Sequence, residues 1–406
     1  MKKHSKTNKT ESSRKQLVKQ QNCSSEPNYA SKEIQAFAKR LGHQPRIIAQ
    51  TEVAYYVGID LGDKRSNYRF LDARGNLVDE GSLTTTHVEL DALFSSIPKC
   101  RIAIEVGTHS PWANALLKSH GHEVFVANPR KMESIQKNRR KNDRVDARIL
   151  ARFVRADPEL LYPIQHRGID ARQSLVLLRA RYALVGVRTK LINCVRGLAK
   201  SMGGRLPKCS ADSFHKAVAE KLPDEIRAAL LPLVAQIEEI TARIREYDLQ
   251  VQGMAAKKYP ETGALRQVRG VGPVTSLAYI LTLENPERFS QSRDVGSYLG
   301  LIPRQDDSGE SSKQLRITKT GDRMLRQLLV SSAQYILGPF GEDCDLQRFG
   351  LKLAARGGKN AKKRAVVAVA RKLSVMLHRL WLTGEVYEPL RNTHLREGTL
   401  ASAAKA

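Results

Sequence analysis

The sequence predicts an α/β domain followed by a mostly α-helical remainder. Two observations lead to this prediction. Between residues 53 and 127, short apolar runs rich in Val, Ile and Tyr alternate with stretches in which apolar residues have helical spacing. This pattern is typical of strands that alternate with helices along the chain. Beyond residue 170, apolar residues recur every three or four positions, which is helical periodicity. A chain of 406 residues is too long for one ordinary core, so two or three domains are expected.

The first part of the chain supplies the α/β elements in a definite order. Residues 1–50 are basic and poor in apolar side chains, which predicts a mostly disordered arm with a short helix near Ser31–Leu41. A domain over residues 51–160 follows. Its expected elements are strands Val53–Asp60, Asn67–Asp72 and Leu77–Ser82, a helix Val88–Ser96, a strand Arg101–Glu105, a helix Pro111–Ser119, a strand Glu123–Ala127 and a helical segment from Lys131. This order is RNase-H-like, or RuvC-like.

Four acidic residues stand at significant places in this domain. Asp60 and Glu105 each end an apolar strand, and Asp143 and Asp146 lie three positions apart, so they share one face of the later helix. Carboxylate oxygens are the ligands that hard divalent cations prefer, and two such ions can hold the attacking and leaving oxygens of a phosphodiester. Any one of these acids could be an ordinary surface residue. The set of four predicts a site for two Mg²⁺ ions, with Mn²⁺ able to substitute.

The composition indicates a polyanionic partner. The formal net charge is +27, from 68 Lys and Arg against 41 Asp and Glu, which favours salt-dependent binding to nucleic acid. An aromatic content of 6% disfavours a protein that holds single strands mainly by base stacking. The chain has no apolar run of the roughly 18 residues that span a bilayer, no secretory signal and no paired cysteines at metal-ligand spacing. We therefore expect a cytoplasmic protein without a membrane partner.

The second half is expected to be a helical linker over residues 161–260 and a C-terminal domain over residues 261–385, with a tail at 386–406. In the linker, Leu233, Ile237, Ile240, Ile244, Tyr247 and Val251 alternate by four and three, which is a short coiled-coil seam. The seam can pair within the chain as a helical hairpin or between chains, and both readings stay open. The expected homo-oligomer is a dimer or a tetramer.

Three features of the C-terminal domain suggest contact with phosphates. Gly270-Val-Gly272 before a helix is typical of a helix-hairpin-helix turn, although a tight turn without ligand has the same pattern. Lys352–Arg379 contains many cations and no acid, which favours polyanion contact over a solvated face. The residues we expect to contact nucleic acid are Arg139, Arg140, Lys141, Arg144, Arg148, Gly270, Gly272, Arg304, Arg316, Lys319, Arg323, Lys359, Lys362, Lys363 and Arg364.

A serine-rich segment follows the Gly270 turn. The sequence around Ser308-Gly309 predicts a polar loop between two apolar segments, with several arginines nearby in the sequence. A serine hydroxyl there could attack a phosphodiester while guanidinium groups stabilise the growing negative charge. A flexible Ser/Gly turn is the simpler reading, and spacing alone does not separate Ser308 from Ser311 or Ser312.

Together these motifs resemble the DEDD transposases of the insertion-sequence family IS110, including its IS1111 subgroup, and the related Piv-type DNA invertases. The resemblance spans about Val53 to Leu380. It rests on Tyr56-Val-Gly-Ile-Asp60, Ile104-Glu105, Gly107-Thr108, Asn128-Pro129, Asn142–Arg148, Gly270-Val-Gly272, Gly300–Pro303, Ser308-Gly309 and Lys319-Thr-Gly321.

The resemblance implies a magnesium-dependent DNA recombinase. It implies a DEDD tetrad of Asp60, Glu105, Asp143 and Asp146, with Ser308 as the nucleophile that forms a phosphoserine intermediate. It also implies double-stranded donor and target DNA and a structured non-coding RNA as guide, in a bacterial cell where the active protein is associated with the nucleoid. Two other readings remain: a RuvC-like hydrolytic, structure-selective nuclease, and a non-catalytic nucleic-acid-binding descendant.

Overall fold

The computed structural model describes residues 53–132, 143–308 and 311–393. The arm expected at residues 1–50 lies outside these ranges, as does the end of the tail. The chain divides into two compact units, Met1–His166 and Arg167–Ala406, and each has its own hydrophobic core. None of the described helices is long and apolar enough to cross a membrane.

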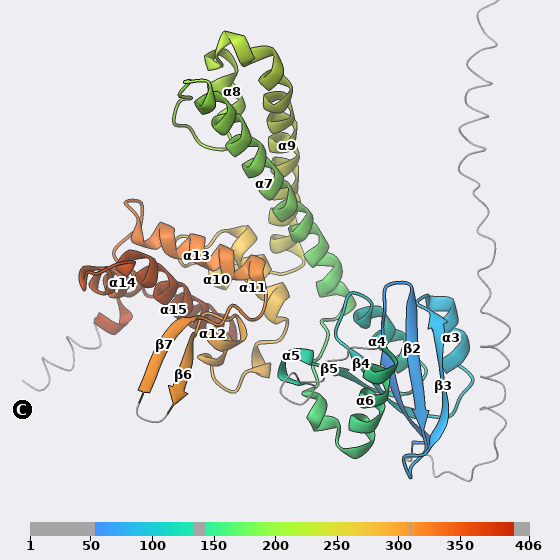
Figure 1. Cartoon of the computed structure of the whole chain (residues 1–406). Helices are drawn as coiled ribbons and strands as arrows, with labels where there is room; N and C mark the ends of the chain where they lie inside the picture. Colours follow the sequence, from blue (N-terminus) through green and yellow to red (C-terminus); the bar gives the residue numbers. More distant parts are fainter. Residues whose placement is uncertain (1–52, 133–142, 309–310, 394–406) are drawn as a thin grey trace, which may run out of the picture. The chain divides into compact units, whose positions relative to one another are not determined.

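The N-terminal unit contains a five-stranded mixed sheet with the order β3-β2-β1-β4-β5 (Figure 1). The strands are β1 Tyr55–Asp60, β2 Arg65–Leu71, β3 Leu77–Thr84, β4 Cys100–Glu105 and β5 Glu123–Ala127. The first three pair antiparallel as a meander, and β1, β4 and β5 run parallel. The sheet and its strand order are compatible with the RNase-H-like fold expected from the sequence.

Helices cover both faces of this sheet. The helices of the unit are α3 His87–Phe94, α4 Ser110–Ser119, α5 Pro129–Met132 and α6 Asp143–Ala156, followed by the short η1 Pro158–Leu161. Leucines and Phe94 of α3 and α4 pack with the alternate strand residues Val57, Ile59, Ile102 and Ile104. Ala103 faces the other way and packs with Leu150 and Val154 of α6. The alternation of side chains along a strand thus separates the two layers.

A long helical hairpin opens the C-terminal unit. It is formed by α7 Ile169–Ser201 and α9 Asp224–Lys257, with α8 Phe214–Val218 and η2 Ala219–Lys221 between them (Figure 1). The seam of α9 packs within the chain. Ile237, Ile244 and Val251 are buried, and Ile237 shares a core with Ile192 and Val195 of α7.

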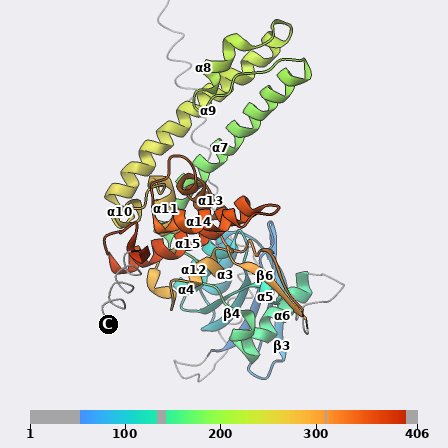
Figure 2. The ribbon, with the colours of Figure 1, turned by 90° about the vertical axis from the view of Figure 1, so that its left-hand side faces the viewer.

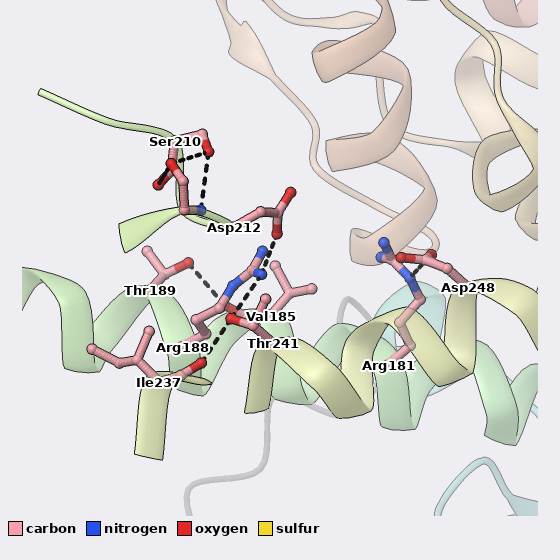
Figure 3. A network of polar contacts seen from close by, with 10 residues as sticks. Arg181, Val185, Arg188, Thr189, Ser210, Asp212, Ile237, Thr241 and Asp248 are labelled. Carbon is pink, nitrogen blue, oxygen red and sulfur yellow. Dashed lines mark hydrogen bonds and ion pairs between the residues drawn. The ribbon is translucent and has the colours of Figure 1, made fainter. Parts of the chain in front are cut away.

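A buried polar network fixes the register of the hairpin (Figure 3). Arg188 of α7 is 7% exposed, and its Nη1 contacts both Asp212 in the connecting segment and Thr241 of α9. Toward the open end, Arg181 donates to Asp248 at 2.6 Å. Because Arg181 and Arg188 of α7 each contact a residue of α9, sliding α7 along α9 would break these contacts.

The remaining elements of the C-terminal unit are short helices, one β-hairpin and one long helix. They are α10 Thr262–Arg266, α11 Pro273–Leu283, η3 Pro286–Arg288, α12 Asp294–Tyr298, β6 Pro303–Ser308, β7 Ser311–Ile317, α13 Arg323–Leu337, α14 Asp345–Ala355 and α15 Ala361–Thr383. The core gathers around α11 and α15, where the Tyr279 hydroxyl donates to Ser374 O at 2.5 Å. Figure 2, turned by 90°, shows the same elements from another side.

The expectation of a polar loop around Ser308 was wrong. Pro303–Ser308 and Ser311–Ile317 pair as an antiparallel hairpin, with Ser308 opposite Ser311. Two extended segments can exchange backbone hydrogen bonds whether or not their side chains are apolar. A two-residue Gly-x link between them, here Gly309-Glu310, is itself a hairpin signal.

Candidate functional site

Asp60 and Glu105 lie side by side at one edge of the sheet. They are the last residues of the neighbouring parallel strands β1 and β4, in which Ile59 is registered with Ile104. Since Ile59 and Ile104 are fully buried on the α3/α4 face, the residues that follow them project toward the α6 face. Both carboxylates are half-buried there.

Helix α6 runs antiparallel to β1. Its last turn lies at the β2–β3 turn, where Arg155 Nη1 donates to Ala73 O at 3.4 Å. That turn is at the start of β1, because Tyr56 pairs with Leu71. The first turn of α6 therefore lies at the other end of β1, where Asp60 is.

Gly58 sets the distance between helix and strand. A Cβ at this position would lie 2.1 Å from Ala147 O and 2.4 Å from Ala151 N, so the helix backbone lies directly against the strand. Asp60 is two residues beyond this contact, about 6.6 Å along the strand. Asp143 is four residues before Ala147, about 6 Å along the helix. The backbone of the first turn of α6 is thus level with Asp60.

The structure brings the backbones of all four predicted acids to this edge of the sheet. The side chains of Asp143 and Arg144 lie outside the described part, whereas Asp60, Glu105 and Asp146 are described and each takes part in a polar interaction. No group of three or more His, Cys, Asp or Glu arranged to hold a metal ion is found among the described residues, and the expected tetrad extends beyond them. The donor set consists of carboxylates, which fits Mg²⁺ or Mn²⁺ better than softer metals.

Ser308 lies at the far end of the β6–β7 hairpin. Its strand begins at Pro303, so the residue projects about 17 Å from the base of the hairpin. The side chains of Ser308, Ser311 and Ser312 lie outside the described part, so the choice among them stays a prediction.

Two glycines anchor the base of this hairpin. Gly300 has φ +66° and would place a Cβ 2.3 Å from Thr320 N, and Gly321 has φ +72° and would place one 2.2 Å from Tyr298 O. Lys319 N donates to Gly300 O at 3.1 Å, and Arg326 Nη1 donates to Leu299 O and Thr320 O at 3.0 and 2.6 Å. Burial lowers the pKa of Arg326 from its ordinary value. These contacts tie the base of the hairpin to the neighbouring loops.

A basic groove lies beside the hairpin, between β7, α14 and α15. Its volume is about 1480 Å³, and among the described residues ten Arg or Lys side chains line it against two acids, Asp345 and Glu388. Asp345 accepts hydrogen bonds from Asn392 and Thr393, so its charge is already engaged. The predicted nucleic-acid contacts that line this groove are Arg316, Lys319, Lys359, Lys363 and Arg364.

The groove includes the start of α15. The segment before it is bent by Gly357, Gly358 and Asn360, which have φ of +70°, +85° and +70°. Asn360 makes no side-chain cap, so the first amides of this 23-residue helix have no side-chain capping acceptor. Such amides, together with the positive end of the helix dipole, favour a bound anion.

The other predicted contacts are dispersed. Arg148 is exposed on α6, Arg304 on β6, Arg323 on α13 and Lys362 on α15, and none of these lines the groove. Arg139, Arg140 and Lys141 lie outside the described residues.

Gly270 is explained by packing. At φ +92° its Cβ would lie 2.9 Å from Tyr335 of α13, whereas a Cβ at Gly272, the residue before α11, would meet nothing within 4 Å. The turn does join two helices, and its phosphate contact stays a prediction.

Sequence reasoning missed Gly58 as a determinant of the carboxylate edge. It included Arg356, Arg371 and Lys372 in the cationic run Lys352–Arg379 but did not single them out, and it missed Arg391, which also lines the groove. Gly58 does carry a signal, because a glycine inside an apolar strand suggests close backbone approach.

Comparison with known families agrees with this architecture. A family model described as a transposase matches residues 57–202, and a second, described as the transposase IS116/IS110/IS902 family, matches residues 263–340. The two matched segments include both the carboxylate edge and the hairpin. The chain belongs to the IS110 family of transposases.

Individual known proteins are similar to this chain over most of their length. The transposase for insertion sequence element IS1111A of Coxiella burnetii is 29% identical over 255 residues, 61% of this chain and 68% of that protein. The transposase for insertion sequence element IS1328 of Yersinia enterocolitica is 26% identical, covering 68% of this chain and 82% of that protein. A pilin gene-inverting protein of Moraxella lacunata is 25% identical, covering 63% and 71%.

Proposed function

We propose that the chain is an insertion-sequence transposase acting as an RNA-guided DNA recombinase, which cleaves and rejoins strands through a phosphoserine intermediate. The observation that carries the proposal is the convergence of Asp60, Glu105 and the first turn of α6 at one edge of the sheet. Three elements distant in sequence meet there, in a member of a transposase family.

Asp60, Glu105, Asp143 and Asp146 would hold the metal. Bound magnesium would polarise the scissile phosphate and neutralise charge that develops on it. The close helix–strand contact at Gly58 fixes the carboxylates of the helix relative to those of the strands, and such fixed geometry is what phosphoryl transfer requires.

Ser308 is the proposed nucleophile. Its Oγ forms a bond to phosphorus, the bond to one strand oxygen breaks, and the released strand end takes up a proton as a free hydroxyl. The phosphoserine ester then keeps the bond energy for rejoining to another strand end. The position of Ser308 at the tip of an anchored, projecting hairpin suits a nucleophile that is delivered to carboxylates elsewhere, including those of another protomer.

The basic groove is proposed to bind the sugar–phosphate backbone of DNA or of a structured guide RNA. Its cations come from strand β7, from helix α15 and from the segments that flank them, so they can neutralise several phosphates. Base pairing with the RNA, rather than side-chain readout, would supply the sequence choice.

Assembly is proposed to involve the helical hairpin. Its a/d seam is already used within the chain, so a coiled-coil contact between protomers would need the outer surface of α7. Exposed apolar residues of that surface include Val176, Val187 and Leu198.

A hydrolytic RuvC-like nuclease is the second candidate. The observation that favours it is that one compact unit contains all four acids, whereas Ser308 belongs to the other unit. A water molecule would then replace the serine as nucleophile, and free strand ends would result.

The test of the carboxylate site compares Asp146→Asn with Glu80→Gln in the full chain. Glu80 is an exposed carboxylate on β3 of the same unit, and it is paired with Arg69 of β2. We expect Asp146→Asn to bind DNA and RNA with unchanged affinity and to lose strand cleavage, while Glu80→Gln cleaves like the unsubstituted protein. Equal cleavage by both variants would refute the carboxylate site.

A further inference from the structure

A ring cluster lies at the same edge of the sheet as Asp60 and Glu105. His109, in the loop that follows β4, accepts a hydrogen bond at Nδ1 from Trp112 Nε1 at 3.1 Å. The ring of His109 is edge-on to Trp112, at 6.0 Å and 88°. On its other side Trp112 stacks with His87 of α3, at 5.7 Å and 24°.

The hydrogen bond fixes the tautomer of His109. An indole N–H can only donate, so Nδ1 of His109 carries no proton in this arrangement. The proton of the neutral ring must therefore be on Nε2. Trp112 thus holds His109 as an Nε2–H donor in a fixed orientation.

That donor faces the loop after β1. Asp63 Oδ1 lies 3.6 Å from Nε2, which is too long for a good hydrogen bond. The Asp63 side chain is 92% exposed and can turn into solvent. Since β1 and β4 end together, the Nε2–H is presented between the two loops that follow the strands of Asp60 and Glu105.

Helix capping does not account for His109. The residue precedes α4, but its side chain caps none of the helix amides. Ser110 makes the local turn instead, accepting from Gly107 N at 3.0 Å and donating to Gly107 O at 2.9 Å. The imidazole is half-buried and its Nδ1 is satisfied by Trp112. Within the described part of the chain, the partner recorded for Nε2 is the exposed carboxylate of Asp63.

We propose that His109 binds a phosphate oxygen of the DNA strand next to the scissile linkage, donating from Nε2, with Trp112 as its positioning residue. The inference rests on the proposed function, because it requires that a phosphodiester lie at this edge. A neutral donor suits the place, since it holds a phosphate oxygen without adding a cation to a site that takes magnesium. A hydrogen bond to a charged group of this kind corresponds to roughly tenfold or more in rate or affinity.

The experiment measures cleavage of junction DNA by the full chain with magnesium and its co-purifying RNA. His109→Ala removes the donor, and His109→Gln keeps an N–H near the place of Nε2. His87→Ala is the matched control, because it removes the other ring stacked on Trp112 and leaves the donor. A parallel series of substrates carries a neutral methylphosphonate at one linkage at a time near the cleavage position.

We expect His109→Ala to cleave about tenfold more slowly, His109→Gln to recover most of the rate, and His87→Ala to stay within about twofold. At one linkage, the methylphosphonate should slow cleavage by the unsubstituted protein. At the same linkage it should cause no further loss in His109→Ala, because that variant already lacks the contact. Unchanged cleavage by His109→Ala overturns the inference. It is also overturned if His109→Ala and His109→Gln lose the same rate and the loss caused by the methylphosphonate adds to the loss caused by either substitution. If the unsubstituted protein and Asp146→Asn are equally inactive, the proposed function itself fails, and this contact fails with it.

Discussion

Replacing Gly58 by alanine should separate the carboxylates without touching any of them. The added Cβ would lie 2.1 Å from Ala147 O, so α6 must retreat by about 0.9 Å to restore a 3.0 Å contact. The atoms it meets belong to the helix backbone, and trimming a side chain of α6 cannot relieve them. Overpacking of this kind costs about 1–3 kcal/mol, and a displacement near 1 Å can cost about 10²-fold in rate.

The assay pairs thermal unfolding with strand cleavage. For a unit of this size, we expect the midpoint temperature of thermal unfolding of the Gly58→Ala protein to fall by roughly 2–4 °C for each kcal/mol of lost stability. Cleavage at a temperature where the variant is fully folded should fall by about 10²-fold. The control is Gly186→Ala in helix α7, where a Cβ meets nothing within 4 Å and alanine should stabilise the helix. An unfolding temperature and a cleavage rate equal to those of the unsubstituted protein would refute the close-contact argument.

Three further predictions concern stability and binding. In urea unfolding, Asp212→Ala should destabilise the α7/α9 helical hairpin by about 1–3 kcal/mol, and by more than Arg188→Met does. The reason is that Asp212→Ala leaves the buried guanidinium of Arg188 with only Thr241 as a partner. A larger loss of stability in Arg188→Met than in Asp212→Ala would contradict the proposed polar network. The double variant Lys363→Ala/Arg364→Ala should bind DNA more weakly, to a similar degree for all sequences. The slope of log K against log salt concentration should become smaller in magnitude by about one to two. An unchanged slope would exclude these residues from the interface. Burial raises the pKa of Glu123, but hydrogen bonds from Arg101 and Lys99 outweigh this effect and lower the pKa below its ordinary value. The ionised Glu123 therefore stabilises the fold at neutral pH, and this stabilisation is lost as the pH falls through the lowered pKa. If Glu123→Gln leaves the unfolding curve at acid pH unchanged, this prediction is contradicted.

The strands of the N-terminal unit could be predicted because their side chains alternate against apolar layers. Strand β5 has the predicted bounds, and β1 and β4 end at Asp60 and Glu105 as expected. These ends depend on local sequence, where an apolar run stops at a charged residue. The partner of each strand follows from connection lengths, since short turns give the antiparallel meander and the helical crossovers give the parallel pairs.

Features that depend on distant contacts were harder to predict. The a/d pattern of α9 left pairing within or between chains open, because a seam does not specify its partner, and α7 proved to be that partner. The groove collects residues from β7, α14 and α15, so its composition follows from tertiary packing and not from any one motif. The β6–β7 hairpin was missed because its strands are polar, whereas strand prediction relies on buried alternation.

Detection of a covalent protein–DNA link tests the central claim most directly. The full chain, with magnesium and its co-purifying RNA, would be incubated with labelled DNA containing the element junction and separated on a denaturing gel, alongside Ser308→Ala and the neighbouring Ser311→Ala and Ser312→Ala variants. We predict a protein-linked DNA band that Ser308→Ala abolishes and the other two retain. Cleaved free ends without any linked band, in the unsubstituted protein, would contradict the phosphoserine mechanism and indicate hydrolysis by the carboxylate site alone.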